Sequence, residues 1–519
     1  MTDVDAIILG GGHNGLVCAG YLARAGLKVL VLERRPFVGG ACVTEEIFPG
    51  YRLSSCSYVC HLLQSKVIDE LEMRRYGFEV YHLDPGRFQP FPDGRGLLVW
   101  DDVERTQSQL AQFSARDAEA FPRWLEFWQR AAGLVYPYYL RPPPTVAEIA
   151  ESVRGTEDEA FLNRLLTASM SDVISEFFES PEVRACFMQT QDVGAPETPG
   201  GAWCYTHIRC DIFSRPKDVG VVKGGMGGIS TALARSAEAH GATLRTDTAV
   251  ERILVSNGRA CGVRLANGEE FTSRIVISNA DPKRTFLQLV SASDLPRPFH
   301  GATKQLKTNA AYLKFHAALN KLPDFSRYFG ADFDPRYLAN IKICPSVDYY
   351  ARSWKDAQSG RPSQTPVMEV QTPSVYDPTL APKGHHVLSA WVLYAPVQLA
   401  EGTWADRNRE VGEHLIDILS QYAPDFRDCL IDWVLYTPQD LEERVALTDG
   451  NIRHIDIVPS QYLASRPLEN WSGYRTPIPD LYLCGAGTHP GGEVTGAPGH
   501  NAAHVISVSY THLTLPTKA

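Results

Sequence analysis

A glycine-rich loop close to the start of the chain constrains its fold more strongly than any other feature. Residues 4–9 are mostly apolar without clean alternation, which is typical of a strand buried on both faces of a parallel sheet. The spacing GxGxxG follows at residues 10–15, and residues 16–25 then predict a helix that ends at Gly26. A second apolar strand at residues 28–32 completes a β-α-β unit.

The three glycines of this loop have the roles expected in a dinucleotide-binding fold. Gly10 allows a tight turn, Gly12 lets the backbone approach a diphosphate, and Gly15 lets the helix pack closely against the strand. The free N–H groups and the dipole at the start of the helix favour the same diphosphate. We therefore expect a dinucleotide to be bound through Gly10, Gly12, His13, Asn14 and Gly15.

An acidic residue at the end of the second strand narrows the choice of cofactor. Glu33 lies about 20 residues beyond the loop, where its carboxylate can accept hydrogen bonds from the ribose hydroxyls of an adenosine. A carboxylate at this position repels a 2′-phosphate, which disfavours NADP. The β-α-β unit by itself leaves both FAD and NAD open.

Two further segments combine strand, glycine-rich turn and helix. In the middle of the chain, Gly224–Gly228 precede a predicted helix at residues 229–240. Near the end, a buried strand at residues 481–484 leads into Gly485–Gly492 and a helix that starts near Gly496. The middle segment also predicts strands at residues 248–255, 260–265 and 269–275.

These segments predict an α/β protein of two interleaved domains. One is a discontinuous, Rossmann-like dinucleotide-binding domain, and the other is an α+β substrate domain inserted into it twice. The chain after Ile506 lacks the periodicity of a core helix, and residues 507–519 are interpreted as a non-native tail. The first domain is predicted at residues 1–75, 215–290 and 461–506, and the second at residues 76–214 and 291–460.

Charge and hydropathy exclude several classes of function. The net charge is −10 and no run of Lys and Arg is longer than two, so a nucleic-acid surface is not expected. No apolar run approaches the roughly 18 residues of a membrane-spanning helix, although peripheral membrane contact stays open. The acidic start leads directly into a strand and leaves no room for a signal or transit peptide. We therefore expect a cytoplasmic protein, or a mitochondrial-matrix protein only if the native N-terminus is longer.

The eleven cysteines indicate neither a metal site nor thiol redox chemistry. None of them forms a CxxC motif or a Cys/His cluster with zinc spacing. Flavoenzymes that reduce disulfides place a CxxxxC pair just after a Gly-Gly, but here Ile47 stands five positions after Cys42. No second β-α-β unit with its own GxGxxG is visible for a nicotinamide cofactor. We expect no metal and no disulfide reductase activity.

In combination, these motifs resemble those of the phytoene desaturase-related flavoproteins, within the wider amine-oxidase-like FAD superfamily. The single motifs are weak, and their order and context make the resemblance specific. It is carried by residues 11–17, 32–35, 38–41, 224–227, 276–282 and 485–492.

This resemblance implies a Rossmann-like FAD-binding domain and extends the set of cofactor contacts. Gly39 and Gly40 would cover the pyrophosphate, and the backbone of Val250 would meet the adenine. Gly487 and Thr488 would lie along the ribityl chain of FAD. Arg34 completes the residues expected to contact the cofactor.

The same resemblance implies an FAD-dependent oxidoreductase of the dehydrogenase or desaturase type. It would move a hydride from a substrate C–H bond to the flavin. The substrate would be an apolar small molecule, and oxygen, a quinone or another acceptor would reoxidise the flavin. His489 and Glu493 are the candidate catalytic residues near the flavin ring, since histidine titrates near neutral pH. A capping or packing role beside Pro490 is an equal alternative for His489.

Alternating large side chains before the middle segment predict one more strand. Trp203, Tyr205 and His207 would lie on one face of it, either as an aromatic substrate wall or packed within a domain interface.

Two other functions stay open. An amine oxidase is the nearer, although the C-terminal motif is Gly487-Thr488-His489 and not the Gly-Glu pair of many amine oxidases. The second is an FAD-binding regulatory protein that acts through a protein partner. The sequence does not identify that partner.

Overall fold

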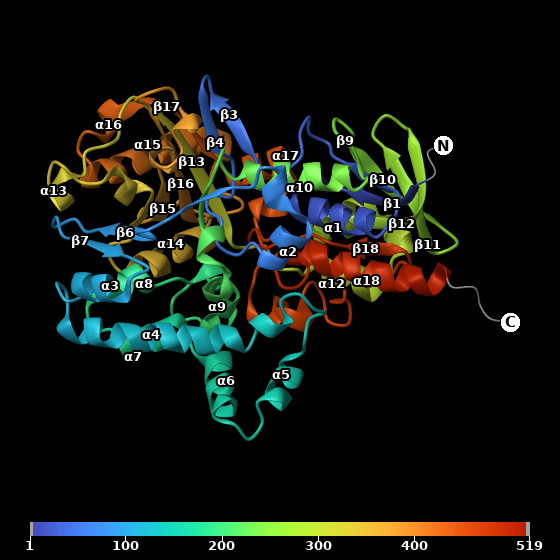
Figure 1. The fold of residues 1–519 in the computed structure, drawn as a ribbon, viewed down its shortest axis with the longest axis horizontal. Helices are drawn as coiled ribbons and strands as arrows, with labels where there is room; N and C mark the ends of the chain where they lie inside the picture. The colour runs from blue at the N-terminus through green and yellow to red at the C-terminus, as the bar shows by residue number, and fades with distance from the viewer. Residues whose placement is uncertain (1–3, 515–519) are drawn as a thin grey trace.

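The structure is a computed structural model that describes residues 4–514. Figure 1 shows two lobes side by side, each built around a β-sheet. The strands of each sheet come from stretches of chain that are far apart in the sequence. The predicted domain boundaries stay predictions.

The first sheet has a parallel centre. β1 (Val4–Leu9) has the predicted bounds and pairs in parallel with β2 (Val29–Leu32) and β12 (Glu270–Ser278). The carboxyl ends of these strands therefore meet at one edge, where open α/β sheets form their ligand crevice. The described strands run in the order β10-β11-β12-β1-β2-β9, with β18 beside β12. The others are β9 (Thr243–Arg245), β10 (Val250–Ser256), β11 (Arg259–Leu265) and β18 (Leu481–Leu483).

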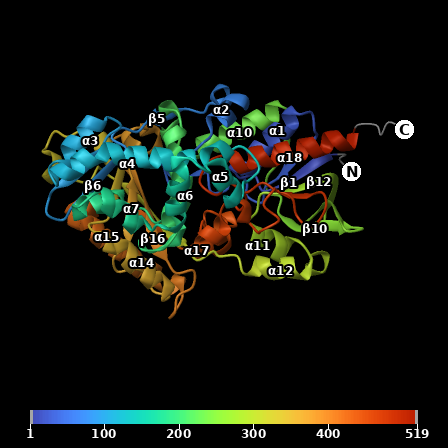
Figure 2. The ribbon, with the colours of Figure 1, turned by 90° about the horizontal axis from the view of Figure 1, so that it is seen from below.

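Three helices lie together over one face of this sheet (Figures 1 and 2). They are α1 (His13–Arg24), α10 (Gly227–Ala239) and α18 (Ala497–Thr514). Leu22 of α1 and Ala502 of α18 share a buried cluster with the strands. The first helix begins three residues before the predicted start, because the last glycine of the loop already belongs to its first turn.

The second sheet is mostly antiparallel and lies in the other lobe. α15 (Trp404–Tyr422) packs on one of its faces, and a group of helices packs against aromatic side chains of the other face. The order is β17-β13-β16-β15-β14-β6-β7. The bounds are β6 (Arg87–Pro90), β7 (Gly96–Val99), β13 (Ala311–Leu319), β14 (Asn340–Ile343), β15 (Val367–Gln371), β16 (His386–Ala395) and β17 (Leu430–Tyr436).

Most of the remaining helices lie in this lobe (Figure 1). The helical group against the second sheet contains α3 (Val103–Leu110), α4 (Ala115–Gly133), α5 (Val146–Ser152), α6 (Glu157–Thr167), α7 (Met170–Phe177), α8 (Pro181–Phe187), α9 (Gly201–Arg209) and α14 (Asp348–Gln358). The shorter elements are α2 (Ser65–Glu70), α11 (Pro282–Arg284), α12 (Arg297–Lys304), α13 (Ser326–Phe329), α16 (Phe426–Cys429), α17 (Pro438–Val445), β3 (Thr44–Phe48), β4 (Tyr51–Ser54), β5 (Val80–His82) and β8 (Gly220–Val222).

Two sequence-based expectations about local structure are wrong. Trp203, Tyr205 and His207 lie in helix α9 and not on a strand. Every residue from Gly201 to His207 is buried, so the helix has no exposed face that would give the sequence a helical period. The C-terminal helix does not break after Ile506 but continues to Thr514. Whether residues 507–519 are native stays open, and 515–519 lie outside the described residues.

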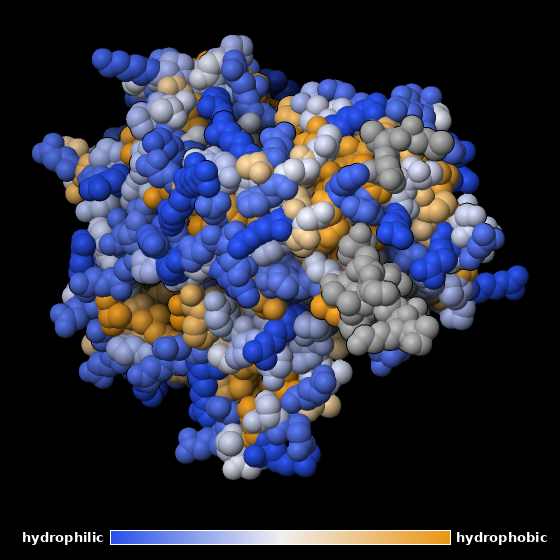
Figure 3. All heavy atoms as spheres, turned by 45° about the vertical axis from the view of Figure 1, so that its right-hand side comes forward, coloured by the Kyte–Doolittle hydropathy of each residue, from blue (hydrophilic) through white to orange (hydrophobic). Residues whose placement is uncertain are grey.

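The surface is largely polar. Hydrophilic residues cover most of the face in Figure 3, with apolar areas between them. Among the described residues, no helix is both long and apolar enough to cross a membrane.

Candidate active site

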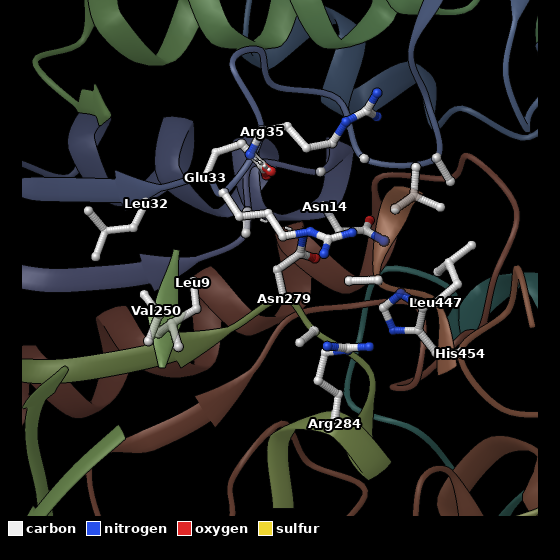
Figure 4. A pocket seen from close by; sticks show the side chains of 18 of the residues that line it. Leu9, Asn14, Leu32, Glu33, Arg35, Val250, Asn279, Arg284, Leu447 and His454 are labelled. Carbon is white, nitrogen blue, oxygen red and sulfur yellow. Dashed lines mark hydrogen bonds between the residues drawn. The ribbon is translucent and has the colours of Figure 1, made fainter. Parts of the chain in front are cut away.

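A pocket lies at the carboxyl ends of β1 and β2, where the glycine-rich loop begins (Figure 4). It encloses about 1050 Å³ of empty space. Its far wall comes from the loop after α17, through Leu447 and His454. Eight of the predicted cofactor contacts line it: Gly10, Gly12, His13, Asn14, Glu33, Arg34, Gly40 and Val250.

The geometry of the glycine-rich loop leaves the start of α1 free for a ligand. Gly12 precedes the helix and supplies no side-chain cap. A Cβ at Gly15 would lie 2.4 Å from the carbonyl oxygen of Gly10, so only glycine allows this crossing of helix and loop. Asn279, at the end of β12, donates its amide to the same carbonyl at 3.2 Å. The first helical N–H groups therefore face the pocket without competition from a cap.

Glu33 connects the loop to the second strand. Its carboxylate is 6% exposed and accepts hydrogen bonds from the backbone of Gly11 at 2.8 Å and of Arg35 at 2.9 Å (Figure 4). Each carboxylate oxygen retains a further lone pair, so Glu33 can hold the loop and also accept ribose hydroxyls.

Unpartnered polar atoms in this pocket fit a bound dinucleotide. Among the described residues, Nε2 of His13, Oδ1 of Asn14 and Nδ1 of His454 are buried without a hydrogen-bond partner. Burial lowers the pKa of His13 to about 4 and that of His454 to about 3, so both rings are neutral. In Figure 4, Leu9 and Val250 lie at one end of the pocket and His454 at the other. From one end of the pocket to the other, an apolar slot suits adenine, free backbone amides suit the diphosphate, and neutral polar groups suit a flavin.

Arg284 is a pocket residue that the sequence interpretation missed. It faces the pocket with Arg34, and its guanidinium lies 3.5 Å from the carboxylate of Glu442. Burial, followed by the charge of Arg284, lowers the pKa of Arg34. The feature of the sequence that could have indicated Arg284 is the motif at residues 276–282, which ends two residues before it.

Two predicted residues near the flavin end lie outside the pocket lining. Thr488 donates its hydroxyl to the carbonyl of Gly485 at 2.8 Å. His489 is fully buried and its Nε2 donates to the carbonyl of Tyr138 at 2.9 Å. Burial lowers the pKa of His489 to about 4. This placement favours the packing role for His489, and its catalytic role stays a prediction. Gly15, Gly39 and Gly487 are likewise absent from the lining.

A second cavity begins where the first one ends. It encloses about 1100 Å³ of empty space, and Ile452 lines both cavities. The next two residues face opposite sides, with Arg453 lining the second cavity and His454 the first. Ile452 therefore separates a cofactor pocket from a neighbouring cavity of comparable size. The apolar part of the second lining includes Tyr58, Leu83, Tyr205, Ile208, Val219, Trp391 and Leu393.

Glu493 lines the second cavity and is bound to Arg453. Nε of Arg453 donates to this carboxylate at 3.0 Å, and Nη1 donates to Asp192 at 2.7 Å and to the hydroxyl of Tyr312 at 2.8 Å. Burial alone would raise the pKa of Glu493. The charge of Arg453, together with smaller contributions from His61 and His207, outweighs the effect of burial and holds the pKa below its ordinary value. A carboxylate held in this way positions Arg453 and is a weak proton acceptor.

Lys314 is the second residue that the sequence interpretation missed. It lies on β13, is fully buried, and its Nζ has no hydrogen-bond partner among the described residues. The nitrogen lies 5.0 Å from the ring centre of Tyr58 and 5.9 Å from that of Trp391, which both line the second cavity. Burial lowers the pKa of Lys314 to about 7. The feature of the sequence that could have indicated Lys314 is a single lysine within the apolar run at residues 311–319.

The cysteines lack the features of catalytic thiols. All eleven are free, and ten of them are buried. Burial raises the pKa of Cys42 to about 11, so the residue after the Gly-Gly is a neutral thiol.

Comparison with known proteins finds similarity along nearly the whole chain. The family model described as flavin containing amine oxidoreductase matches residues 15–503. The chain is 36% identical to pyridine nucleotide-disulfide oxidoreductase domain-containing protein 2 of Rattus norvegicus, over 97% of this chain and 93% of that protein. It is 26% identical to a lycopene-forming phytoene desaturase of Pseudescherichia vulneris, over 94% of this chain and 96% of the desaturase. Cyclohexylamine oxidase from Brevibacterium oxydans has a similar structure, with a TM-score of 0.61 and 16% identity over 98% of this chain and all of that one.

Proposed function

The chain belongs to the family of flavin-containing amine oxidoreductases and is an FAD-dependent oxidoreductase, and we propose that it dehydrogenates a substrate with an apolar body in the second cavity. The resemblance to the phytoene desaturase-related flavoproteins and the amine-oxidase-like fold are thereby confirmed. FAD is the cofactor.

The observation that carries this proposal is the shared wall at Ile452. FAD, when bound, accepts a hydride from a substrate C–H bond. Ile452 lines both the second cavity and the cofactor pocket, so a substrate in the second cavity would lie against the wall that the two share. Apolar side chains that include Tyr58 and Trp391 line part of the second cavity, which suits the apolar body of a substrate that donates a hydride.

Lys314 is the proposed proton acceptor. Dehydrogenation removes a hydride and a proton, so a base must take the proton while the hydride leaves. The amine of Lys314 has a pKa of about 7 and no hydrogen-bond partner among the described residues, and it lies behind two side chains of the cavity wall without lining the cavity itself. A pKa close to the operating pH is the favourable value for a general base. Glu493 would hold Arg453 in position, and His489 would support the C-terminal turn.

Anaerobic mixing of the FAD-loaded protein with candidate substrates tests the proposal. Polyenes, acyl chains and amines would be compared by the loss of flavin absorbance. We expect compounds with an apolar body to bleach the flavin and amines to leave it unchanged. Bleaching by amines alone, with hydrogen peroxide released in air, would instead establish an amine oxidase. Protein that cannot be loaded with FAD would refute the proposal.

Two further expectations from the sequence stand as proposals. We propose that the protein works in the cytoplasm. A regulatory role through a protein partner is the alternative if no compound reduces the flavin. In that case Gly12→Asp, which would remove FAD, should leave partner binding intact.

A further inference from the structure

The cofactor pocket is lined by three arginines and, among the described residues, by a single carboxylate. The arginines are Arg34, Arg35 and Arg284, and the carboxylate belongs to Glu33. Arg35 is already paired, because its Nη2 donates to the carboxylate of Glu45 at 2.6 Å. The other two arginines are held less firmly.

The position of Arg284 follows from the turn after β12. Asp281 is the N-cap of α11 and accepts a hydrogen bond from the backbone N–H of Arg284 at 2.8 Å. The side chain of Arg284 lines the pocket, and Figure 4 shows it between Val250 at the adenine end and His454 at the flavin end. Its carboxylate neighbour in the described chain is Glu442, at 3.5 Å through Nη2, while its buried Nε has no hydrogen-bond partner there. Arg284 thus keeps a donor for a ligand in the middle of the pocket.

Arg34 is the second such group. It directly follows Glu33 at the end of β2, and its Nη2 donates to the backbone carbonyl of Glu443 at 2.6 Å. Within 4 Å it forms no ion pair with a carboxylate of the described chain. After burial, the like charge of Arg284 is the main cause that lowers the pKa of Arg34, and the charge of Glu33 offsets this effect only in part. An anion in contact with both guanidinium groups would relieve their repulsion.

The glycine-rich loop alone does not balance the charge of a diphosphate. The diphosphate of FAD carries two negative charges, whereas the N-terminus of a helix supplies about half a positive charge. A guanidinium adds a full charge, and its planar N–H groups match two oxygens of a phosphate. Arg34 and Arg284 can therefore supply the counter-charge that the loop lacks.

We propose that the guanidinium groups of Arg284 and Arg34 bind the diphosphate of FAD, with Arg284 as the main determinant of affinity. Arg284 has the larger effect because its side chain is only 22% exposed, whereas Arg34 is exposed at the pocket mouth. This inference goes beyond the proposed function, since it rests on FAD as the cofactor and not on the substrate or the base.

Calorimetric titration of the FAD-free full chain with FAD and with ADP tests the inference. ADP shares the diphosphate and the adenosine of FAD but lacks the flavin. We expect Arg284→Met to raise the dissociation constants of both ligands at least about tenfold, because each loses a charged contact to its diphosphate. Arg284→Lys should retain part of the affinity, and the loss should narrow at about 1 M NaCl, which screens the charge. Arg274→Met, at an exposed arginine of β12 outside the pocket lining, should bind both ligands like the parent protein.

A further variant separates ligand binding from support of α17. Glu442→Gln removes the ion pair with Arg284 but keeps the guanidinium, so the affinity for ADP should be unchanged or higher. If Glu442→Gln loses as much affinity as Arg284→Met, the inference is overturned, because Arg284 then acts only by holding α17.

Two other results would also overturn the inference. One is an unchanged affinity for ADP in Arg284→Met, and the other is a parent protein that does not bind ADP at millimolar concentration. Arg34→Met, with a smaller expected loss, gives an independent test if Arg284→Met does not fold. A parent protein that binds no FAD would instead contradict the cofactor assignment and the proposed function.

Discussion

Two buried lysines on the second sheet show how the same side chain acquires opposite roles. Lys342 donates to the carbonyls of Ala185, Cys186 and Met188 at 2.7–3.1 Å. Lys314 lies on β13, three strands away from the β14 strand of Lys342, and its Nζ has no hydrogen-bond partner among the described residues. Burial lowers the pKa of Lys342 only to about 8 but that of Lys314 to about 7. Lys342 supplies hydrogen bonds to the fold, whereas Lys314 supplies none, which is why Lys314 is the candidate for a functional role.

Lys314→Met should make the protein more stable at neutral pH. The folded-state pKa of Lys314 is about 7 and its ordinary value is 10.5, so the unfolded chain binds more protons between these values. Stability contributed by this residue therefore rises from pH 7 to 10.5, and at pH 7 the lysine costs roughly 4 kcal/mol. Urea denaturation of the apo protein at pH 7 measures the gain. The matched change Lys342→Met should destabilise the protein, because three buried carbonyls lose their donor.

The same variant should slow flavin reduction despite its greater stability. If Lys314 is the base, the reduction rate rises with pH through about 7, as the ammonium loses its proton. The neighbouring Cys56 thiol, with a pKa raised by burial to about 12, and His316, with a pKa well below its ordinary value, do not titrate in this range. Stopped-flow reduction between pH 6 and 9 should show the rise in the parent protein and a flat, slower profile in Lys314→Met. An unchanged profile would exclude Lys314 as the base.

At the scale of the element, the N-terminus of α1 depends on one close approach. The helix starts at His13 and crosses the preceding loop at Gly15, where a side chain would meet the Gly10 carbonyl. Because the loop and the helix start form the diphosphate site together, any shift at this crossing displaces the amides that bind FAD.

Gly15→Ala should therefore weaken FAD binding by at least about tenfold and destabilise the protein, since a Cβ only 2.4 Å from a backbone oxygen forces the helix away. FAD affinity is measured by flavin fluorescence during titration of the apo protein. Gly301→Ala, in helix α12 with no atom within 4 Å of the added Cβ, is the matched control and should bind FAD normally. Equal affinities of the two variants would contradict the role of the crossing.

The position of the loop at residues 451–456 also matters for the proposed function, because this loop forms the wall between the two cavities. Its anchor is Arg453, which is 5% exposed and bound to Asp192, Tyr312 and Glu493. Arg453→Met should cost about 3–5 kcal/mol, because it leaves the buried Asp192 without its cation. Chemical denaturation of the apo protein checks this loss, and a loss below 1 kcal/mol would show that the network is not what holds the loop.

At the scale of the whole molecule, the cofactor pocket is assembled from three distant parts of the chain. Its lining comes from residues 9–41, 248–289 and 445–486. A ligand that contacts all three parts binds the folded chain and not the unfolded one, so FAD should stabilise the entire assembly.

FAD at a hundredfold excess over its dissociation constant should stabilise the protein by about 2.7 kcal/mol. Thermal unfolding of the apo protein at increasing FAD concentration measures this effect as a concentration-dependent rise of the midpoint. Gly12→Asp should abolish the rise, because a carboxylate would occupy the diphosphate position. A rise that persists in this variant would place FAD elsewhere.

The sequence by itself determined the features that depend on short stretches of chain. β1, the glycine-rich loop and Glu33 lie within about 30 residues of each other, and a β-α-β unit closes its contacts within that length. The order of its elements and a dinucleotide cofactor could therefore be predicted, whereas FAD followed from the family resemblance, and the comparisons confirmed it. Helix α9 could not be predicted from the sequence, because a helix that is buried on every side shows no hydrophobic periodicity.

Only the tertiary structure decided which side chains come together at the second cavity. Arg453 bonds to Asp192 across 261 residues, and Lys314 meets Trp391 through the pairing of two strands. Arg87 and Arg209 come from a strand and a helix that share no local pattern. Such residues become neighbours only when separate segments pack together, and burial then sets their charge and pKa. The glycine-rich loop by itself predicted a dinucleotide, whereas the second cavity is formed by contacts that no short stretch of sequence contains.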